Sequence, residues 1–167
     1  AQLYQVLNDE CLPRWKVILN QALMDNVAAI IDAGSLLAGV TNADAAKYLI
    51  SNPLFNFEEF CGVQYFEMNC MDNGNLILNG QWMVLDARTN LSEPRYRYSK
   101  NDANTFILFD DARCRGADKK MDIDATAALT LGIKMTKDVL MQGAGRLRQL
   151  GQRQKLLVYC PDIIYKN

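Results

Sequence analysis

A short apolar run that ends in two carboxylates constrains the fold of this chain more than any other feature. Residues 105–109 read Thr-Phe-Ile-Leu-Phe, and Asp110 and Asp111 follow directly. Five such residues are too few for a helix and are typical of a central strand. We therefore expect a strand over Thr105–Phe109 with both aspartates at its carboxyl end.

Other apolar runs predict further strands at Val27–Ile31, Asp124–Leu131 and Lys155–Cys160. Apolar residues at helical spacing predict one helix from about Pro13 to Met24 and a second, capped by Asn42, that ends near Ile50. Strands that alternate with helices indicate an α/β domain with a mostly parallel central sheet.

Polar residues follow the strand predicted at 27–31. Asp32 and Ser35 come directly after it. Ligands of α/β sheets lie beyond the carboxyl ends of the strands, so these two residues are candidates for a binding site. The alternative is that Asp32 only caps a turn.

The middle of the chain predicts a β-hairpin inserted beside the parallel strands. Val63–Glu67 is a strand candidate, and Asp72–Asn75 is a turn signal. A second turn signal, Asn79-Gly80, separates Leu76–Leu78 from Trp82–Leu85, and such a dipeptide between apolar runs is typical of a hairpin.

Arginines and tyrosines alternate in the polar stretch 86–104, which contains Arg88, Arg95, Tyr96, Arg97, Tyr98 and Lys100. Such residues can stack on and pair with a single-stranded nucleic acid. The alternative is a solvated edge strand or loop.

Glycines mark two places where the backbone is expected to turn or approach another group. Gly116 permits a tight turn after Arg115, and Asp118 is then placed to accept hydrogen bonds from loop amides or to pair with an arginine. Gly143 and Gly145 lower helix propensity, which suggests close approach by a backbone or a ligand.

A helix is predicted over residues 136–150. At about 100° per residue, Gln142, Arg146 and Gln149 share a polar stripe that can point into a cleft. Arg148 lies roughly 200° round from Arg146, so the two side chains point in different directions along a regular helix.

Composition excludes several classes of protein. The 167 residues suit a single domain, and the net charge of -1 lacks the basic excess of a dedicated nucleic-acid binder. No membrane span is visible, so no membrane partner is expected. The chain begins at Ala1 without a Met or a signal peptide, and we expect it to be a fragment of a larger protein.

The absence of histidine excludes Ser-His-Asp and Cys-His catalysis and most zinc sites within the chain alone, so no metal site is predicted. The five cysteines are odd in number and form no CxxC pair, which favours a reducing compartment. We expect an intracellular, cytoplasmic location.

Two motifs carry a resemblance to a known family. Arg115-Gly116-Ala117-Asp118, after a hydrophobic strand, resembles motif V (RGxD) of superfamily 2 helicases, and residues 142–146, Gln-Gly-Ala-Gly-Arg, resemble the QxxGR of motif VI. Their spacing is similar to that in the second RecA-like lobe of these proteins, including its form in the SecA motor.

A closer similarity covers about Thr105 to Tyr159, with a weaker one over Ala28 to Leu49. FDDARCRGADKK and MTKDVLMQGAGRLRQLGQ resemble a segment of very large eukaryotic proteins. These are catalogued as a domain of unknown function and are often labelled ubiquitin thioesterases.

The resemblance implies one RecA-like, helicase C-terminal-like domain of three layers over residues 1–167, which closes on ATP and Mg held by an upstream RecA-like ATP-binding lobe of the same protein. It implies that Arg146 is an arginine finger and that Gln142 positions water or phosphate. It also implies two sets of contacts: Arg115, Gly116, Asp118, Gly145 and Gln149 to the nucleotide, and Arg95, Arg97, Arg113 and Arg148 to a nucleic acid.

The chain differs from these helicases at three points. Gln149 stands where motif VI has a second arginine, Asp110 replaces the threonine of motif V, and no GxxxxGK(S/T) phosphate loop occurs. We therefore expect no ATP hydrolysis by the chain alone. Two alternatives remain open, a degenerate scaffold lobe and a part of a large ubiquitin-pathway protein with its active site elsewhere. The substrate that is moved, RNA, DNA or protein, is also open.

Overall fold

The computed structural model describes residues 4–7, 12–113, 119–132 and 153–161. Within them lie two α-helices, α1 (Arg14–Met24) and α2 (Asn42–Ser51), and short 3-10 turns η1 (Arg95–Arg97), η2 (Asp102–Asn104) and η3 (Asp111–Arg113). The large sheet consists of β1 (Tyr4–Leu7), β2 (Ala29–Ile31), β3 (Gly62–Glu67), β6 (Gln81–Asp86), β7 (Ser92–Pro94), β8 (Thr105–Phe109), β9 (Thr126–Thr130) and β10 (Lys155–Pro161). A separate two-stranded ribbon consists of β4 (Cys70–Asp72) and β5 (Asn75–Ile77).

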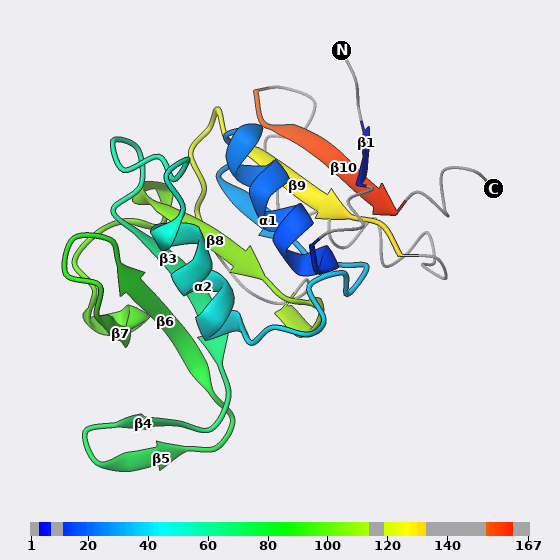
Figure 1. Cartoon of the computed structure of the whole chain (residues 1–167). Coiled ribbons are helices and arrows are strands. Elements are labelled where there is room, and N and C mark those ends of the chain that lie inside the picture. The colour runs from blue at the N-terminus through cyan, green and yellow to red at the C-terminus, as the bar shows by residue number, and fades with distance from the viewer. Residues whose placement is uncertain (1–3, 8–11, 114–118, 133–152, 162–167) are drawn as a thin grey trace.

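The large sheet is mostly parallel, as the sequence predicts. Its order is β1-β10-β9-β2-β8-β3-β6-β7, and every pair from β1 to β3 is parallel (Figure 1). β3, β6 and β7 pair antiparallel and extend one side of the sheet. The predicted α/β fold with an inserted β-hairpin is confirmed.

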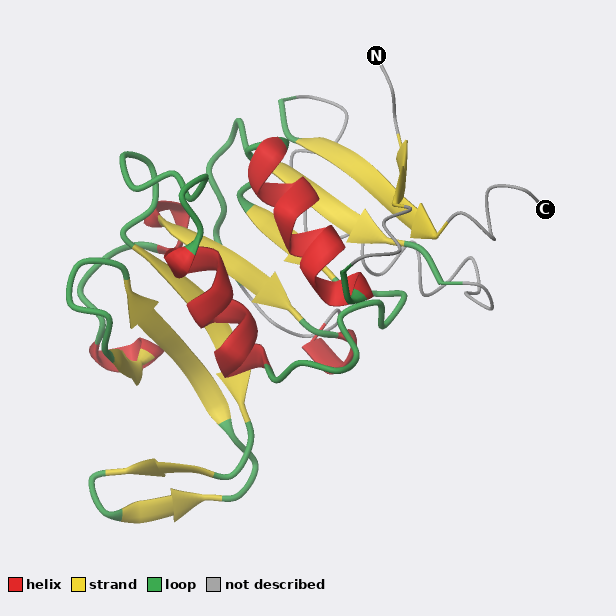
Figure 2. Cartoon of the chain, in the orientation of Figure 1, coloured by secondary structure: helices red, strands yellow, loops and turns green. Residues whose placement is uncertain are grey.

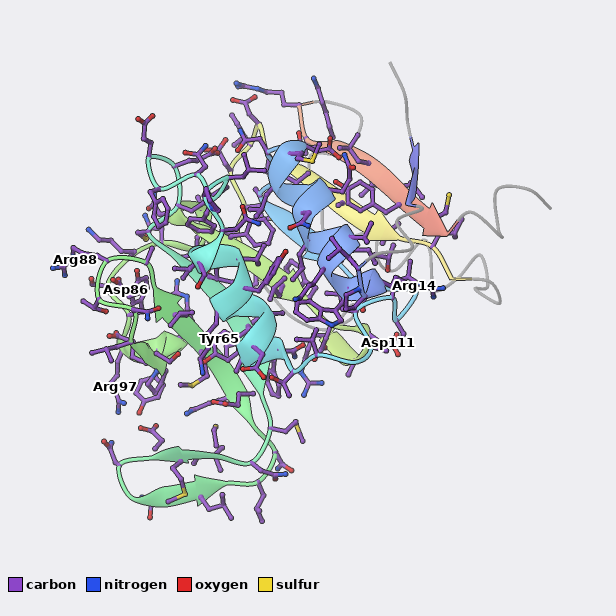
Figure 3. The ribbon with its side chains drawn as sticks, in the orientation of Figure 1. Arg14, Tyr65, Asp86, Arg88, Arg97 and Asp111 are labelled. Carbon is purple, nitrogen blue, oxygen red and sulfur yellow. The ribbon has the colours of Figure 1, made fainter. Side chains whose placement is uncertain are left out.

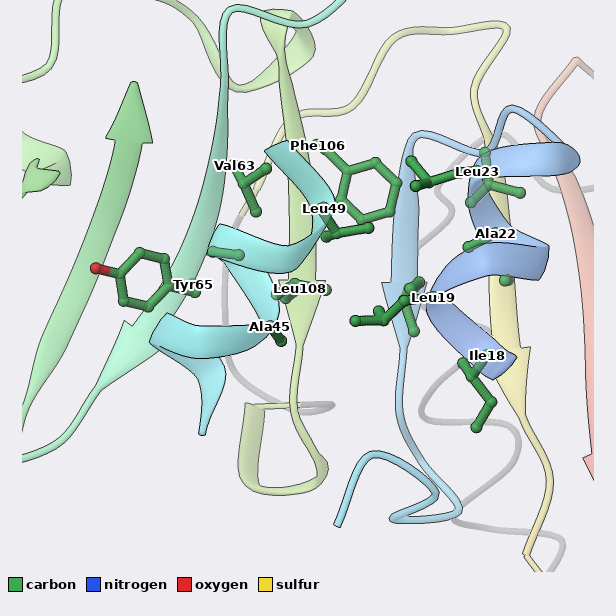
Figure 4. Close-up of a cluster of buried hydrophobic side chains, with 14 of the residues drawn as sticks. Ile18, Leu19, Ala22, Leu23, Ala45, Leu49, Val63, Tyr65, Phe106 and Leu108 are labelled. Atoms are coloured by element: carbon green, nitrogen blue, oxygen red, sulfur yellow. The ribbon is translucent and has the colours of Figure 1, made fainter. Parts of the chain in front are cut away.

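Helices α1 and α2 cover one face of the sheet (Figure 2). From α1, Ile18, Leu19, Ala22 and Leu23 are buried at the helical spacing that predicted this helix. They pack with Leu49 of α2 and with inward side chains of the strands into one continuous cluster (Figure 4). Because a parallel sheet is stable only when its faces are covered, these helices are required by the sheet.

The opposite face of the sheet carries a second buried cluster. Ile31, Ile107, Phe109 and Leu129 lie there with at most 1 % of their surface exposed, and Met121 is among the side chains packed against them. A core on both sides of the sheet is compatible with the predicted three layers.

Helix α2 begins one residue away from the predicted cap. The Thr41 hydroxyl, not the side chain of Asn42, accepts a hydrogen bond from the Asp44 amide at 3.1 Å. The prediction that Asn42 is the N-cap is therefore wrong. Asn42 is instead the first residue of the helix, and its amide group bonds to other elements.

The pairing of the inserted strands also differs from the prediction. Leu76–Leu78 does not pair with Trp82–Leu85. β5 pairs with β4 across Asn73 and Gly74, and β6 pairs with β3. Asn73 and Gly74 have φ values of 51° and 81°, which suit the tight turn of a two-residue hairpin. Strand β1 was not predicted.

The predicted helix over 136–150 lies outside the described residues. The extent of the domain, predicted as a single unit over residues 1–167, stays a prediction.

Replacement of Gly80 by Ala should destabilise the protein. Gly80 has a φ of 75°, and a Cβ there would overlap the carbonyl oxygen of Glu67. Backbone strain and the steric clash together should lower the free energy of unfolding by about 2–4 kcal/mol, measured by urea denaturation. The matched control is Gly74→Ala, where φ is 81° but no atom lies within 4 Å of the added methyl. It should cost about 1 kcal/mol, and an equal loss in both variants would contradict the close contact at Gly80.

Candidate functional site at the carboxyl edge of the sheet

The candidate site lies where the carboxyl ends of β2 and β8 meet. The two strands are neighbours, but their connections leave in opposite directions, β2 to β3 through α2 and β8 back to β9. α2 packs on one face of the sheet, while Lys119 and Met121, from the β8–β9 connection, pack on the other. This is the switch point of a parallel sheet, where α/β proteins bind their ligands.

Asp32 follows β2 at this switch point and is 4 % exposed. Its Oδ1 accepts hydrogen bonds from the Leu36 amide at 2.8 Å and the Thr130 hydroxyl at 2.7 Å, and its Oδ2 accepts one from the Leu37 amide at 3.0 Å. These contacts are those of a turn cap, one of the two interpretations of Asp32. They also tie the loop after β2 to the end of β9.

Burial raises the pKa of Asp32 above its ordinary value. Hydrogen bonds from Thr130, Leu37 and Leu36 act in the opposite direction because they favour the charged carboxylate, and the nearby charge of Asp111 adds to the rise. Asp111 is therefore close enough to Asp32 for the two carboxylates to interact.

The loops after β2 and β9 touch through two glycines. A Cβ on Gly34 would lie 2.5 Å from the backbone nitrogen of Gly132, and the Gly34 amide donates to the Thr130 hydroxyl at 2.9 Å. No larger residue fits at Gly34 without moving this backbone. The close approach fixes the position at which the chain leaves β9.

Asp110 joins the end of β8 to α2 and β3. Its Oδ2 accepts a hydrogen bond from Asn42 Nδ2 at 2.8 Å, and Asn42 Nδ2 also donates to the carbonyl of Phe66 at 2.9 Å. Its Oδ1 accepts from the Arg113 amide at 2.9 Å. We call Asn42, Phe66, Asp110 and Arg113 the edge junction, because they hold three elements together at the carboxyl edge.

Two cations of the β8–β9 connection lie over aromatic rings of the inserted strands. The guanidinium carbon of Arg113 is 3.6 Å from the centre of the Phe66 ring, and Lys119 Nζ is 4.3 Å from that of Trp82. Phe66 and Trp82 meet edge to face at 5.8 Å, and Trp82 meets Phe109 of β8 in the same way at 5.9 Å. Cation–π contacts therefore fasten Arg113 to β3 and Lys119 to β6.

Asp111 is the exposed carboxylate of this edge. Figure 3 shows it at the same end of the molecule as Arg14, the first residue of α1. Because Asp32 and Asp110 use their oxygens for internal hydrogen bonds, Asp111 is the carboxylate best placed to meet a ligand. Within the described residues, no group of three or more His, Cys, Asp or Glu side chains is placed to hold a metal ion.

Of the residues to which the resemblance assigns contacts with the nucleotide or a nucleic acid, Arg95, Arg97 and Arg113 are described. Arg113 belongs to the edge junction, and Arg95 and Arg97 lie in η1. The others lie outside the described residues: Arg115, Gly116, Asp118, Gln142, Gly145, Arg146, Arg148 and Gln149. Their roles stay predictions.

Arg95 is bonded to Asp102, a partly buried residue of η2. Its Nε donates to Asp102 Oδ1 at 2.9 Å, and Asp102 Oδ1 also accepts from Gln64 Nε2 at 2.8 Å. Although burial favours the neutral acid, hydrogen bonds from Gln64, the Lys120 amide and Arg95 hold the pKa of Asp102 below its ordinary value. Arg95 thus stabilises the start of β8.

Arg97 and its neighbouring tyrosines are also engaged within the chain. Arg97 Nη1 donates to Asp72 Oδ1 at 2.8 Å, and the Tyr96 hydroxyl donates to the other oxygen of Asp72. The Tyr98 hydroxyl donates to Asp86 Oδ2 at 2.8 Å. Within the part of the chain that the structure describes, these contacts give the alternation of arginine and tyrosine a structural role, and contact with a nucleic acid stays a prediction.

The sequence analysis missed both the true cap of α2 and the contacts of Asn42. The signal for the cap was present, since Thr41 lies three residues before Asp44, which is the spacing of a capping box with Asp in place of Glu. No sequence signal indicates that the Asn42 amide bonds to Phe66 and Asp110, because both partners are distant in the chain.

Comparisons with family models, with curated proteins and with solved structures found no match to this chain. Among the described residues, no helix is long and apolar enough to cross a membrane. The family resemblance therefore depends on the motifs and segments quoted above, and it stays a prediction.

The stability of the protein should depend on pH through Asp32. Its folded pKa is raised above the ordinary 3.8, so the native state holds this proton more tightly than the unfolded chain. Its contribution to the free energy of unfolding is then greatest below pH 3.8 and falls as the pH rises through the folded pKa. In Asp32→Asn this slope should be absent, as measured by denaturant unfolding over a pH series.

The control for this experiment is Asp72→Asn. Hydrogen bonds from Tyr96 and Arg97 lower the pKa of Asp72, so its contribution is present above pH 3.8 and is lost as the pH falls through the lower folded pKa. The two variants should change the pH profile in opposite directions. An unchanged slope in Asp32→Asn would show that Asp32 titrates as it does in the unfolded chain.

Proposed function

We propose that this chain is the second RecA-like lobe of an ATP-dependent helicase- or translocase-like protein. In this proposal it supplies an arginine finger, Arg146, and coupling residues to an ATP-binding lobe that carries the missing phosphate loop. The lobe does not hydrolyse ATP alone. Its substrate is a single-stranded nucleic acid or a protein.

One structural observation supports the proposal more strongly than any other. β8 and β9 lie on either side of β2 and run parallel to it, so both end at the switch point marked by Asp32. The segment with Arg115-Gly116-Ala117-Asp118 follows the end of β8, and the segment with Gln142 to Arg146 follows the end of β9. The chain thus leaves the sheet toward both motifs from one edge.

In this proposal, Asp111 is the described residue of this edge that faces the nucleotide. Carboxylates repel phosphates, so Asp111 would meet a nucleotide through its magnesium ion or an attacking water, not through phosphate oxygens. Bound Mg²⁺ and Arg146 would supply positive charge toward the transferring phosphoryl group. Asp32 and Asp110 hold the described loops at the ends of β2 and β8.

A scaffold lobe that has lost hydrolysis is the second candidate. Gln149 in place of the motif VI arginine favours it, and so does the β4–β5 ribbon, which exposes apolar side chains of the kind found at protein interfaces. A role as part of a ubiquitin-pathway protein would place the active site elsewhere, since the chain has no histidine to activate a cysteine.

The proposed setting is intracellular and cytoplasmic. Cys61 and Cys70 are free cysteines within the described residues, which is the state that a reducing compartment maintains.

The test is ATP hydrolysis by the chain joined to its ATP-binding lobe, with and without single-stranded RNA. Arg146→Ala should lower the rate by about tenfold or more, because an arginine finger stabilises charge that develops in the transition state. Binding of ATP, measured with a fluorescent analogue, should change less than the rate.

Arg153→Ala is the matched control. Arg153 forms an exposed ion pair with Asp124 at 2.7 Å, and such pairs contribute little to stability. This variant should keep the wild-type rate. If the joined protein is folded and neither binds nor hydrolyses ATP, the motor proposal is wrong and the scaffold lobe is favoured.

A further inference from the structure

The β4–β5 ribbon projects from the carboxyl edge of the sheet. It follows the end of β3, which runs parallel to β8, and it extends beyond the body of the domain (Figure 1). Within the described residues β4 and β5 pair only with each other, so each keeps one open edge. The ribbon therefore stands beside the candidate site with its outer side available.

One face of the ribbon is fastened to the domain. Cys70 is opposite Ile77 on this face and is 6 % exposed, and Asp72 lies on the same face because side chains alternate along a strand. Asp72 pairs with Arg97 at 2.8 Å and with the Tyr96 hydroxyl. These contacts fix the orientation of the ribbon relative to η1.

The other face is apolar and exposed. Met71 and Leu76 are directly opposite each other on it, and the exposed Leu78 follows β5 directly in the chain. Their exposed fractions are 60 %, 54 % and 64 %. We call Met71, Leu76 and Leu78 the apolar ribbon face. A group of large apolar side chains in solvent marks an interaction site.

The ribbon is also connected to the edge junction. Arg113 lies over the ring of Phe66 at the end of β3, and its Nη2 lies 3.5 Å from Met68 Sδ at the start of the ribbon. Asn42 bonds to the carbonyl of Phe66 and to Asp110. A partner that binds the ribbon therefore contacts a part of the chain that is joined directly to the end of β8.

The charge of the ribbon and the area that its apolar side chains can bury indicate which kind of partner binds it. Residues 68–80 contain no Lys or Arg, and their one charged side chain, Asp72, is already paired. A nucleic acid is disfavoured because its phosphates need cations. A second copy is disfavoured because three side chains from each ribbon bury far less than the roughly 800 Å² per partner of a stable interface between separate molecules. A lobe of the same protein needs less area, because its high effective concentration favours the contact.

We propose that the β4–β5 ribbon docks through the apolar ribbon face and its open edges into an uncharged, apolar groove of the ATP-binding lobe. A groove encloses a narrow ribbon on several sides and so buries more area than a flat surface does. This inference depends on the proposed function for the identity of the partner. It adds a contact through which closure of the two lobes is transmitted to Asp110 and Arg113.

The test is site-specific crosslinking in the protein that contains both lobes. A photo-crosslinking phenylalanine derivative is placed at Met71, Leu76 or Leu91, one position at a time. Leu91 is the matched control, since it is 69 % exposed and lies in the turn before β7, outside the ribbon. Positions 71 and 76 should crosslink to the ATP-binding lobe with about tenfold or more the yield of position 91.

A second variant separates docking from catalysis. Met71→Ser combined with Leu76→Ser should lower ATP turnover by about tenfold or more and should keep the far-ultraviolet circular dichroism of the wild type. Arg146→Ala should lose turnover and keep the crosslinks.

Crosslinks without ATP turnover in the wild type would support docking and contradict the motor. Crosslinks confined to nucleic acid or to a second copy, equal yields at all three positions, or unchanged turnover in the double variant would overturn the docking proposal.

Discussion

The burial of β8 is the constraint on which the rest of the structure depends. All five residues of this strand are buried, and parallel neighbours bond to it on both sides. A strand in this position cannot reach water, so its side chains need cover on both faces of the sheet. α1 and α2 provide that cover on one face, and the second cluster around Ile107 and Phe109 occupies the other. The first polar residues that the chain can place in solvent after β8 are Asp110 and Asp111, and this is why the carboxylates gather at that edge.

The edge junction turns this arrangement into a connected site. Asp110 is held by Asn42 from α2, while Arg113 stacks on Phe66 from β3. These contacts join the end of a core strand to the base of an inserted ribbon that carries exposed apolar side chains. A movement of the ribbon would therefore change the position of the loop after β8. The same loop leads in sequence to Arg115-Gly116-Ala117-Asp118. We propose that the inserted strands act on this segment as well as extending the sheet.

The candidate site could be predicted in part. The position of Asp32, Asp110 and Asp111 at strand ends follows from apolar runs that stop abruptly, and the structure places them at one edge. Their partners could not be predicted, because Asp32 meets Thr130 across 98 residues and Asn42 meets Asp110 across 68. The turn signal at Asn79-Gly80 was misread for a related reason. A dipeptide shows that the chain turns, but the strand that pairs after the turn depends on which neighbour offers a matching buried face.

The sequence by itself determined the element types of the parallel sheet except β1, and the edge at which its carboxylates lie. Periodicity and run length are local properties, and burial of β2, β8 and most of β9 follows from them. Only the tertiary structure decided the strand order, the pairing of β3 with β6, and the use of arginines as structural partners. The physical reason is that hydrogen bonds, ion pairs and ring contacts join residues far apart in the chain. The local sequence around a carboxylate or an arginine is the same whether its partner is another side chain or a ligand.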